Sequence, residues 1–130
     1  MRGRTTAADE PTGRLRKRSE FLAAAAGRKH AAGSLVLQCL ARDSDSGGTT
    51  RFGFTVMRKV GNAVERNRVR RRLRAAVSQV GPYATLPGHD YVLIGRRATL
   101  TAPFAQIVQD LASAFSRVHE ARGANARRQR

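Results

Sequence analysis

The fold and the partner of this chain are both indicated by one stretch, Lys59-Val60-Gly61-Asn62-Ala63-Val64-Glu65-Arg66-Asn67-Arg68-Val69-Arg70-Arg71-Arg72-Leu73-Arg74. Apolar residues recur in it and just beyond it at the spacing of an α-helix, at Val69, Leu73, Ala76, Val77 and Val80. At about 100° per residue they form one stripe, and the arginines fan around the rest of the surface. The pattern predicts a helix from about residue 64 to residue 80 that packs on a core by one side only.

The opposite side of this helix is strongly basic. Glu65 is the one acid set against six arginines between residues 66 and 74, whereas a solvated helix face normally mixes charges of both signs. Arginine offers a planar fork of donors that suits phosphate oxygens and guanine edges. The chain of 130 residues has a net charge of +16, and all but three of its 25 basic residues are arginine. From the residues alone, the predicted partner is a polyanion.

The order of residues in the stretch resembles the Arg-Asn-Arg signature of the bacterial ribonuclease P protein subunit. The string from Val60 to Arg74 follows the family pattern with fixed spacing, and Arg66-Asn67-Arg68 stands at its centre. Three other segments also resemble the family: Gly13 to Phe21 at its start, Arg51 to Val56 before the signature, and Asp90 to Arg96 in its last strand. The resemblance covers roughly residues 13 to 119.

This resemblance implies a function and a set of site residues. The family's holoenzyme is an endoribonuclease that cuts precursor tRNA to give the mature 5′ end, and its RNA subunit is the catalyst and uses Mg²⁺. The implied partners are that catalytic RNA and precursor tRNA, with this chain as a monomer in a 1:1 ribonucleoprotein. The implied RNA-binding residues are Lys59, Arg66, Asn67, Arg68, Arg70, Arg71 and Arg74. A cleft for the single-stranded 5′ leader would be lined by Phe21, Gln38, Thr55, Met57 and Arg58.

Two positions of the expected leader cleft depart from the family. Ala25 stands where a second aromatic residue is common, four residues after Phe21, and Gln38 stands where the first strand often has an aromatic residue. An aromatic platform is worth about 1–3 kcal/mol per stacked base, so stacking capacity should be reduced here. Considered from the residues alone, Phe21 is expected to be a core residue of the first helix, whereas the resemblance implies a stacking platform. Asn67 likewise fits either an exposed neutral position or an amide that contacts a base edge or a 2′-hydroxyl.

Residues that could catalyse hydrolysis are not grouped in this sequence. The only close pairs of acids, Asp9 with Glu10 and Asp43 with Asp45, fall in a predicted tail and a predicted loop, without the rigid setting of a two-metal nuclease. The three histidines lack metal-ligand spacing, and we expect them at the surface or in capping roles: His30, His89 and His119. Cys39 lies in an apolar run, which predicts a buried, inert thiol. No catalytic residue is therefore expected in the protein, and no metal ligand is assigned.

The predicted element order is α-β-β-(β)-α-β-α, an α+β fold of the two-layer α/β sandwich type. The expected elements are a helix over 20–26 capped by Ser19, strands over 35–41 and 51–58, an optional short strand near 62–64, the arginine helix, a strand over 91–96, and a last helix capped by Thr101. Crossovers between parallel strands are right-handed in about 98% of cases. The resemblance implies the rare left-handed one, and we adopt that expectation.

The chain is expected to hold one domain between two tails. Residues 1–13 are predicted to be a disordered tail, residues 14–120 the RNA-binding domain, and residues 121–130 a basic C-terminal tail. No apolar run approaches the roughly 18 residues of a membrane span, so we expect a cytoplasmic protein without membrane contact.

Three other classes of protein compete with this interpretation. A ribosomal or architectural RNA-binding protein without nuclease association has the same composition, and only the Arg-Asn-Arg spacing separates the two. A helix-turn-helix DNA reader would need a short helix before the arginine helix, where residues 51–57 predict a strand. A stand-alone nuclease is disfavoured by the scattered acids.

Overall fold

The computed structural model describes residues 12–42 and 49–128, with side chains described for residues 14–42 and 49–119. The elements in chain order are β1 (Thr12–Arg14), α1 (Arg18–Ala25), β2 (Arg28–Ala32), β3 (Leu35–Ala41), β4 (Thr50–Val56), the 3₁₀ turn η2 (Arg58–Val60), α2 (Ala63–Ala84), β5 (His89–Gly95), α3 (Arg97–Thr101) and α4 (Phe104–Arg128). In this part of the chain, no helix combines the length and the apolar character needed to cross a membrane.

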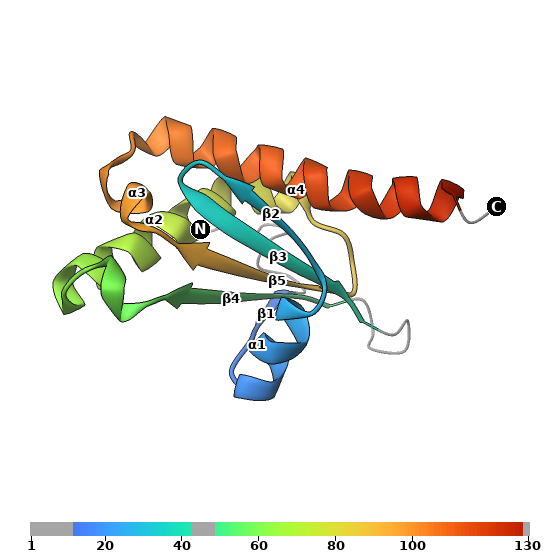
Figure 1. Ribbon diagram of the computed structural model, residues 1–130, viewed down its shortest axis with the longest axis horizontal. Coiled ribbons are helices and arrows are strands. Elements are labelled where there is room, and N and C mark those ends of the chain that lie inside the picture. Colours follow the sequence, from blue (N-terminus) through green and yellow to red (C-terminus); the bar gives the residue numbers. More distant parts are fainter. Residues whose placement is uncertain (1–11, 43–48, 129–130) are drawn as a thin grey trace, which may run out of the picture.

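One five-stranded sheet organises the molecule, in the order β1-β4-β5-β3-β2. β1, β4 and β5 are parallel, whereas β3 is antiparallel to β5 and to β2. Helices α2 and α4 pack on one face, and α1 packs at one end of the other face (Figure 1). β4 and β5 point the same way and α2 joins them behind the sheet in this view, so the crossover is left-handed. The expected α+β fold and its unusual crossover are confirmed.

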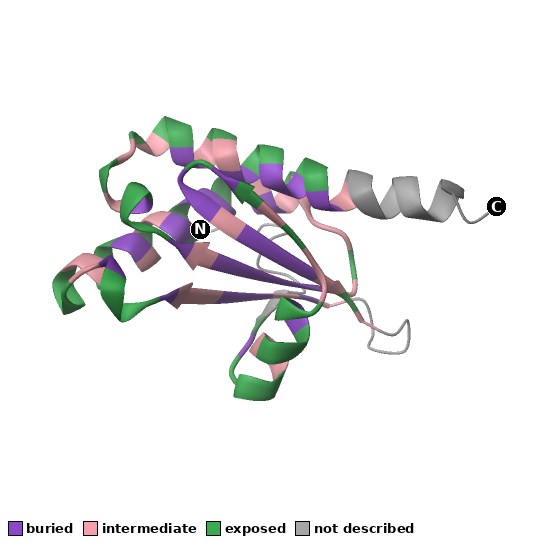
Figure 2. Cartoon of the chain, viewed as in Figure 1, coloured by how far each residue is buried: buried purple, intermediate pink, exposed green. Residues whose placement is uncertain are grey.

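The main core lies between the sheet and the helices α2 and α4. Alternate residues of β3, β4 and β5 point to it, and Tyr91 of β5 is fully buried there between Phe52 and Phe115. The predicted apolar stripe of α2 is part of the same cluster: Val69, Leu73, Ala76 and Val77 are buried. Figure 2 shows this pattern as buried residues along the middle of the strands and on the inner sides of the helices.

The ends of α2 differ from the prediction. It begins at Ala63, with Asn62 as its N-cap, so the optional strand near residues 62–64 is absent and η2 takes its place just before. It also runs through Gly81 and Pro82 to Ala84 instead of ending at Val80. The extra turn is stabilised by Thr85, whose backbone N–H and hydroxyl both donate to the Gly81 carbonyl, at 3.2 Å and 2.8 Å. Capping and packing therefore outweigh the usual helix-breaking effect of proline here.

Four other elements differ from the prediction. β2 was missed because its sequence, Arg-Lys-His-Ala-Ala, is mostly polar, and its pairing is supplied by β3 across a turn at residues 33–34. α1 starts at Arg18, and the Glu20 carboxylate, not Ser19, accepts the free N–H groups before its first turn. Thr101 ends the short helix α3, and α4 begins only after Pro103.

The expected domain limits also shift. Residues 12 and 13 form part of β1, so the expected tail is too long by these two residues, and the rest of it, residues 1–11, lies outside the described residues. At the other end, α4 continues as a helix to Arg128, through most of the expected basic tail.

Truncation of the α2 stripe should destabilise the protein. Leu73 is fully buried between α2 and the sheet, so Leu73→Ala should lower the free energy of unfolding by about 2–5 kcal/mol, measured by urea denaturation. Arg71→Ala, on the exposed side of the same helix, should change it by less than about 0.5 kcal/mol. Equal losses for the two variants would mean that α2 does not dock by this stripe.

Candidate RNA interface

The start of α2 is held by a reciprocal cap. The Glu65 N–H donates to Asn62 Oδ1 at 2.8 Å, and the Asn62 N–H donates to Glu65 Oε1 at 3.0 Å. Gly61 is extended, and a Cβ at this position would collide with the Glu65 side chain. The other Glu65 oxygen pairs with Arg97 at 3.1 Å, and Arg97 also donates to the Val60 carbonyl. The hydrogen bond from Asn62 and the Arg97 guanidinium lower the pKa of Glu65, which keeps it ionised.

Glu65 is bound to Asn62 and Arg97 and, among the described residues, does not pair with the arginines that follow it in α2. The ion pairs that join two described side chains are made by Arg42, Arg51 and Arg97, and none of them uses an arginine of α2. We call the exposed and half-exposed side of α2 the arginine face. It consists of Arg66, Asn67, Arg68, Arg70, Arg71 and Arg74. Within it, Arg70 donates to Asn67 Oδ1 at 3.1 Å, and Arg66 donates to the Gly61 carbonyl at 3.1 Å.

Arg72 belongs to the same sequence run but has a different role. Its guanidinium donates to the carbonyls of Leu100 and Ala102, which close the end of α3. It therefore ties α2 to the connection before α4 and is not part of the arginine face. This contrast was not visible in the sequence, where all six arginines look alike.

Phe21 of α1 packs against β4 on the face of the sheet opposite α2. A Cβ on Gly53 would come within 2.6 Å of the Phe21 ring, so the ring needs the bare backbone of β4 beneath it. Leu15, Ala24 and Val92 complete this small second core. Phe21 is nevertheless only half-buried, because one side of the ring lines two open hollows. The ring thus packs against the sheet and also remains accessible, and its assignment to a leader platform stays a prediction.

The two hollows beside Phe21 bring several predicted residues together. A hollow of about 180 Å³ lies between Phe21, Gly53, Arg70 and Arg74, and one of about 480 Å³ lies between Phe21, Thr55 and Arg70. They are also lined by residues that the sequence analysis did not assign to a site: Arg14, Arg16, Arg18 and Phe54. The basic run from Arg14 to Arg18 was a usable signal for the three arginines, whereas nothing in the sequence pointed to Phe54.

A third hollow, of about 460 Å³, lies at the end of β4 and β5. It joins Met57 and Lys59 with Ile94 and with Arg96 and Arg97, which were not predicted. Its lining combines apolar residues, among them Met57, which is 53% exposed, with the basic residues Lys59, Arg96 and Arg97.

The other two residues predicted for the leader cleft, Arg58 and Gln38, do not line these hollows. Arg58 is exposed on η2, and Gln38 is only 9% exposed within β3, between Lys29 and Val92 of the neighbouring strands. Little of the Gln38 side chain is thus available to a ligand, and its assignment to a leader cleft stays a prediction.

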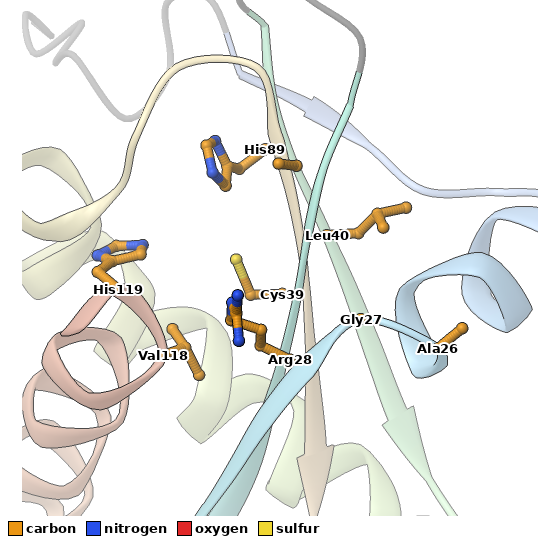
Figure 3. A pocket seen from close by; sticks show the side chains of 9 residues that line it. Ala26, Gly27, Arg28, Cys39, Leu40, His89, Val118 and His119 are labelled. Carbon is orange, nitrogen blue, oxygen red and sulfur yellow. The ribbon is translucent and has the colours of Figure 1, made fainter. Parts of the chain in front are cut away.

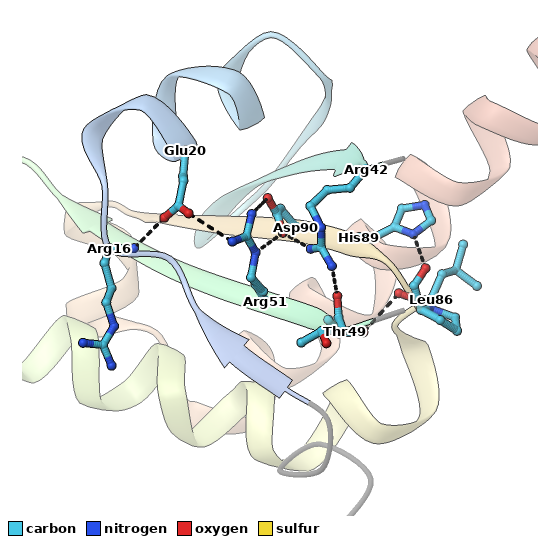
Figure 4. A network of polar contacts seen from close by, with 10 residues as sticks. Arg16, Glu20, Arg42, Thr49, Arg51, Leu86, His89 and Asp90 are labelled. Carbon is cyan, nitrogen blue, oxygen red and sulfur yellow. Dashed lines mark hydrogen bonds and ion pairs between the residues drawn. The ribbon is translucent and has the colours of Figure 1, made fainter. Parts of the chain in front are cut away.

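A polar network links α1 to the sheet (Figure 4). Asp90 of β5, 2% exposed, is paired with Arg42 and with Arg51, the latter at 2.7 Å, and Arg51 also reaches Glu20 of α1 at 3.0 Å. The bond to Asp90 raises the pKa of Arg51. Backbone N–H groups of Lys17 and Arg16, and then Arg51, lower the pKa of Glu20. Since Glu20 precedes Phe21 in the chain, this network helps to place the Phe21 ring.

A fourth hollow, of about 410 Å³, lies at the opposite end of the sheet from the start of α2 (Figure 3). Cys39, 6% exposed as expected for a buried thiol, lines it together with His89 and His119. His89 is also 6% exposed, so the expected surface position is wrong for it. His89 Nδ1 contacts the Pro87 carbonyl at 2.9 Å, and His119 Nε2 contacts the Tyr91 hydroxyl at 2.8 Å, so both rings make structural contacts.

The described residues of this chain do not supply a site for a protein-held Mg²⁺ ion. Among the described residues, no group of three or more His, Cys, Asp or Glu side chains could hold a metal. The four acids with described side chains are each bound elsewhere: Glu20 and Asp90 in the network of Figure 4, Glu65 at the α2 cap, and Asp110 to Ser34 and Gln106. The pairs Asp9–Glu10 and Asp43–Asp45 lie outside the described residues.

The fold and the arginine face define a basic α+β RNA-binding protein, and the comparisons agree. The family model for Ribonuclease P matches residues 10–119. A Ribonuclease P protein component from Ruegeria pomeroyi is 49% identical over 106 residues, which cover 81% of this chain and 85% of that protein. One from Paramagnetospirillum magneticum is 52% identical over 108 residues, covering 81% of each. The chain therefore belongs to the ribonuclease P protein family, whose members are the protein component of an RNA-containing endoribonuclease.

Solved structures show the same fold. The RNase P protein of Staphylococcus aureus aligns with a TM-score of 0.66 at 25% identity, covering 79% of this chain and 92% of that one. The RNase P protein of Thermotoga maritima aligns with a TM-score of 0.64 at 24% identity, covering 77% of this chain and 92% of that one.

A helix-turn-helix protein is excluded by the element before α2, which is strand β4 followed by a three-residue 3₁₀ turn.

The contribution of Glu20 to stability should be lost in acid. Its pKa is lowered by folding, so its contribution is complete above the ordinary carboxyl pKa of about 4.3 and disappears as pH falls through the lower folded value. Glu20→Gln should therefore be less stable than the parent at pH 7, and the difference in free energy of unfolding should shrink steadily below about pH 4. Urea denaturation across this range is the measurement. A difference that stays constant down to pH 2 would contradict the assignment.

Proposed function

We propose that this chain binds the catalytic RNA of ribonuclease P through the arginine face and Lys59, and holds the 5′ leader of precursor tRNA on the side of the sheet that carries α1. In this way it assists removal of the leader and formation of the mature tRNA 5′ end. One copy would act with one catalytic RNA, in the cytoplasm.

The observation that carries the proposal is the uncompensated charge of α2. Five arginines of the arginine face have no acidic partner among the described residues, although acids elsewhere in the molecule are paired with arginine. Like charges on one helix repel one another and contribute nothing to folding, so a polyanionic partner explains them. The long-range attraction of such a surface for phosphates also speeds association.

The leader part of the proposal is supported by the geometry around Phe21. The ring is held by Gly53 beneath it and by the second core beside it, and it keeps an accessible side. A rigid, half-exposed aromatic ring bordered by arginines is typical of proteins that stack single-stranded bases. Thr55 and Arg70 border the same space.

We assign hydrolysis to the RNA subunit, with Mg²⁺ held by RNA. The support is the commitment of the described acids to structural contacts, which leaves no carboxylate cluster for a metal in the described part of the chain. The protein would then contribute binding and orientation. Its arginines would neutralise RNA phosphates and favour a compact RNA–substrate arrangement.

Reconstitution tests the function directly. The full chain, freed of RNA by nuclease treatment, should not cut precursor tRNA in Mg²⁺. With a ribonuclease P RNA at low salt and limiting Mg²⁺, it should increase site-specific cleavage above that of the RNA alone. Specific cleavage by the RNA-free protein, or no effect of the protein on the RNA, would overturn the proposal.

Loss of two arginines should weaken assembly with the catalytic RNA. Arg66→Ala with Arg68→Ala removes two charges away from the apolar stripe, so the thermal melt should be unchanged, while the slope of log affinity against log salt should fall by about 0.7–0.9 for each lost phosphate contact. Filter binding across a salt series is the measurement. Lys29→Ala, on the exposed edge strand β2, is the control for loss of charge elsewhere. Unchanged affinity and slope in the double variant would remove this face from the RNA interface.

Loss of the Phe21 ring should act only on RNA that has a leader. Phe21→Ala should weaken precursor tRNA binding to the holoenzyme by about 1–3 kcal/mol and leave mature tRNA nearly unaffected. Leu22→Ala, 58% exposed on the same helix, is the matched control. If both RNAs lose affinity alike, Phe21 acts only by holding α1 on the sheet.

A further inference from the structure

Helix α4 continues beyond the sheet that it covers (Figure 1). Val118 is its last buried residue among the described side chains, whereas the helix runs on to Arg128. At a rise of 1.5 Å per residue, this continuation is about 15 Å long. Residues 120–130 also lie beyond the part of the chain that matches the family model. The fold that the family shares therefore does not account for this part of the helix.

The continuation of α4 is strongly basic. From residue 117 to residue 130 the sequence contains five arginines and one acid, Glu120. Arg122, Arg127 and Arg128 fall within the helix beyond Val118. Like charges along one helix repel one another, so they do not favour its formation in isolation. A polyanion bound alongside would offset this repulsion.

A hollow beside the same end of α4 adds a further cation (Figure 3). It is the hollow of about 410 Å³, which Val118 and His119 of α4 line together with Arg28 of β2. Arg28 is half-buried and makes no ion pair with a described side chain, and no described acid lines the hollow. A guanidinium group in such a position can bind two oxygens of one phosphate group.

This end of the molecule is separate from the surfaces assigned above. His89, which also lines the hollow, begins β5, whereas α2 starts after the end of β4, beside Gly95 at the other end of β5. α4 and α1 also pack on opposite faces of the sheet, so a leader held on the α1 side does not pass along α4. Residues 116–130 include no Phe, Tyr or Trp on which bases could stack. Cations without such rings suit the phosphates of an RNA double helix, whose bases are turned inward.

We propose that the α4 end, defined as Arg28 with residues 117–128 of α4, is a second contact for the catalytic RNA and binds the phosphate backbone of a double-helical segment. This inference rests on the proposed function, because it takes the same RNA as partner, but it uses a surface that the function does not involve. Arg28 binds one phosphate in the hollow, and the neighbouring phosphates lie along the continuation of α4. Contacts at both ends of the sheet fix the orientation of the protein on the RNA, which one helix face alone does not do.

Two sets of variants of the full chain test the α4 end. Arg28→Gln removes the guanidinium group from the hollow. Its matched control is Lys29→Gln, which removes the same charge from the next residue, on the other face of β2. The triple variant Arg122→Gln, Arg127→Gln, Arg128→Gln removes charge from the continuation of α4. Its control replaces the same three residues by Lys, which keeps the charge. Filter binding to the catalytic RNA across a salt series is the measurement.

The expected result is a loss of salt dependence in the Gln variants. Arg28→Gln should lower the slope of log affinity against log salt by about 0.7–0.9, and the Gln triple should lower it by about 2–3, at one phosphate contact for each arginine. Lys29→Gln and the Lys triple should bind as the parent does. None of these positions belongs to the described core, so the thermal melts should match that of the parent.

A fluorescent single-stranded leader RNA is the second probe, and every variant should bind it as the parent does. A parent-like slope with the catalytic RNA for either Arg28→Gln or the Gln triple would overturn the proposal. Equal losses with the leader RNA and the catalytic RNA would also overturn it, because the effect would then be a general loss of charge. The same holds if Lys29→Gln loses as much as Arg28→Gln.

Failure of this inference is distinguishable from failure of the proposed function. If the parent chain stimulates cleavage and the Arg66 and Arg68 double variant loses affinity, the function holds whatever the α4 variants do. Combining that double variant with the Gln triple should lower the slope by the sum of the two separate losses, because distant surfaces on one RNA act independently. A combined loss no greater than the larger separate loss would overturn a contact at both ends.

Discussion

Docking of α2 on β4 and β5 by a single apolar stripe is the constraint on which the rest of the structure depends. The stripe of Val69, Leu73, Ala76 and Val77 buries one side of the helix and leaves the other side in solvent. The same docking closes the crossover between two adjacent parallel strands. Had the stripe been wider, the arginines would need burial or acidic partners, and a continuous basic face could not form.

Arginine has two opposite roles in this molecule, and the surroundings decide which one applies. Arg42 and Arg51 neutralise the buried Asp90, and Arg72 donates to a carbonyl at the end of α3. These guanidinium groups therefore stabilise the fold. Those on the outer side of α2 have no such partner among the described residues. Planar, permanently charged donors suit both tasks, because they bind carboxylates, carbonyls and phosphates with similar geometry. Composition alone therefore overstates the charge that is available to RNA.

The α1 side of the sheet offers no accessible aromatic ring at the two positions that depart from the family pattern, Ala25 and Gln38. Ala25 is exposed, and Gln38 is nearly buried, so neither offers a platform. The accessible rings, Phe21 and Phe54, instead gather near the open edge of β4, on either side of Gly53.

The sequence by itself determined the α+β class, the arginine helix and the membership of its family. These features depend on local periodicity and on a fixed string of residues, which survive without knowledge of distant contacts. The left-handed crossover came from the resemblance, since general rules favour the opposite hand. Tertiary structure decided the rest. β2 forms because β3 supplies its hydrogen-bonding partner. Arg72 is bound within the fold and Arg71 is not, because carbonyls at the end of α3 lie beside Arg72. Phe54 borders an open hollow because β1 is too short to cover it. Each of these depends on which residues meet across the fold, and spacing along the chain does not contain that information.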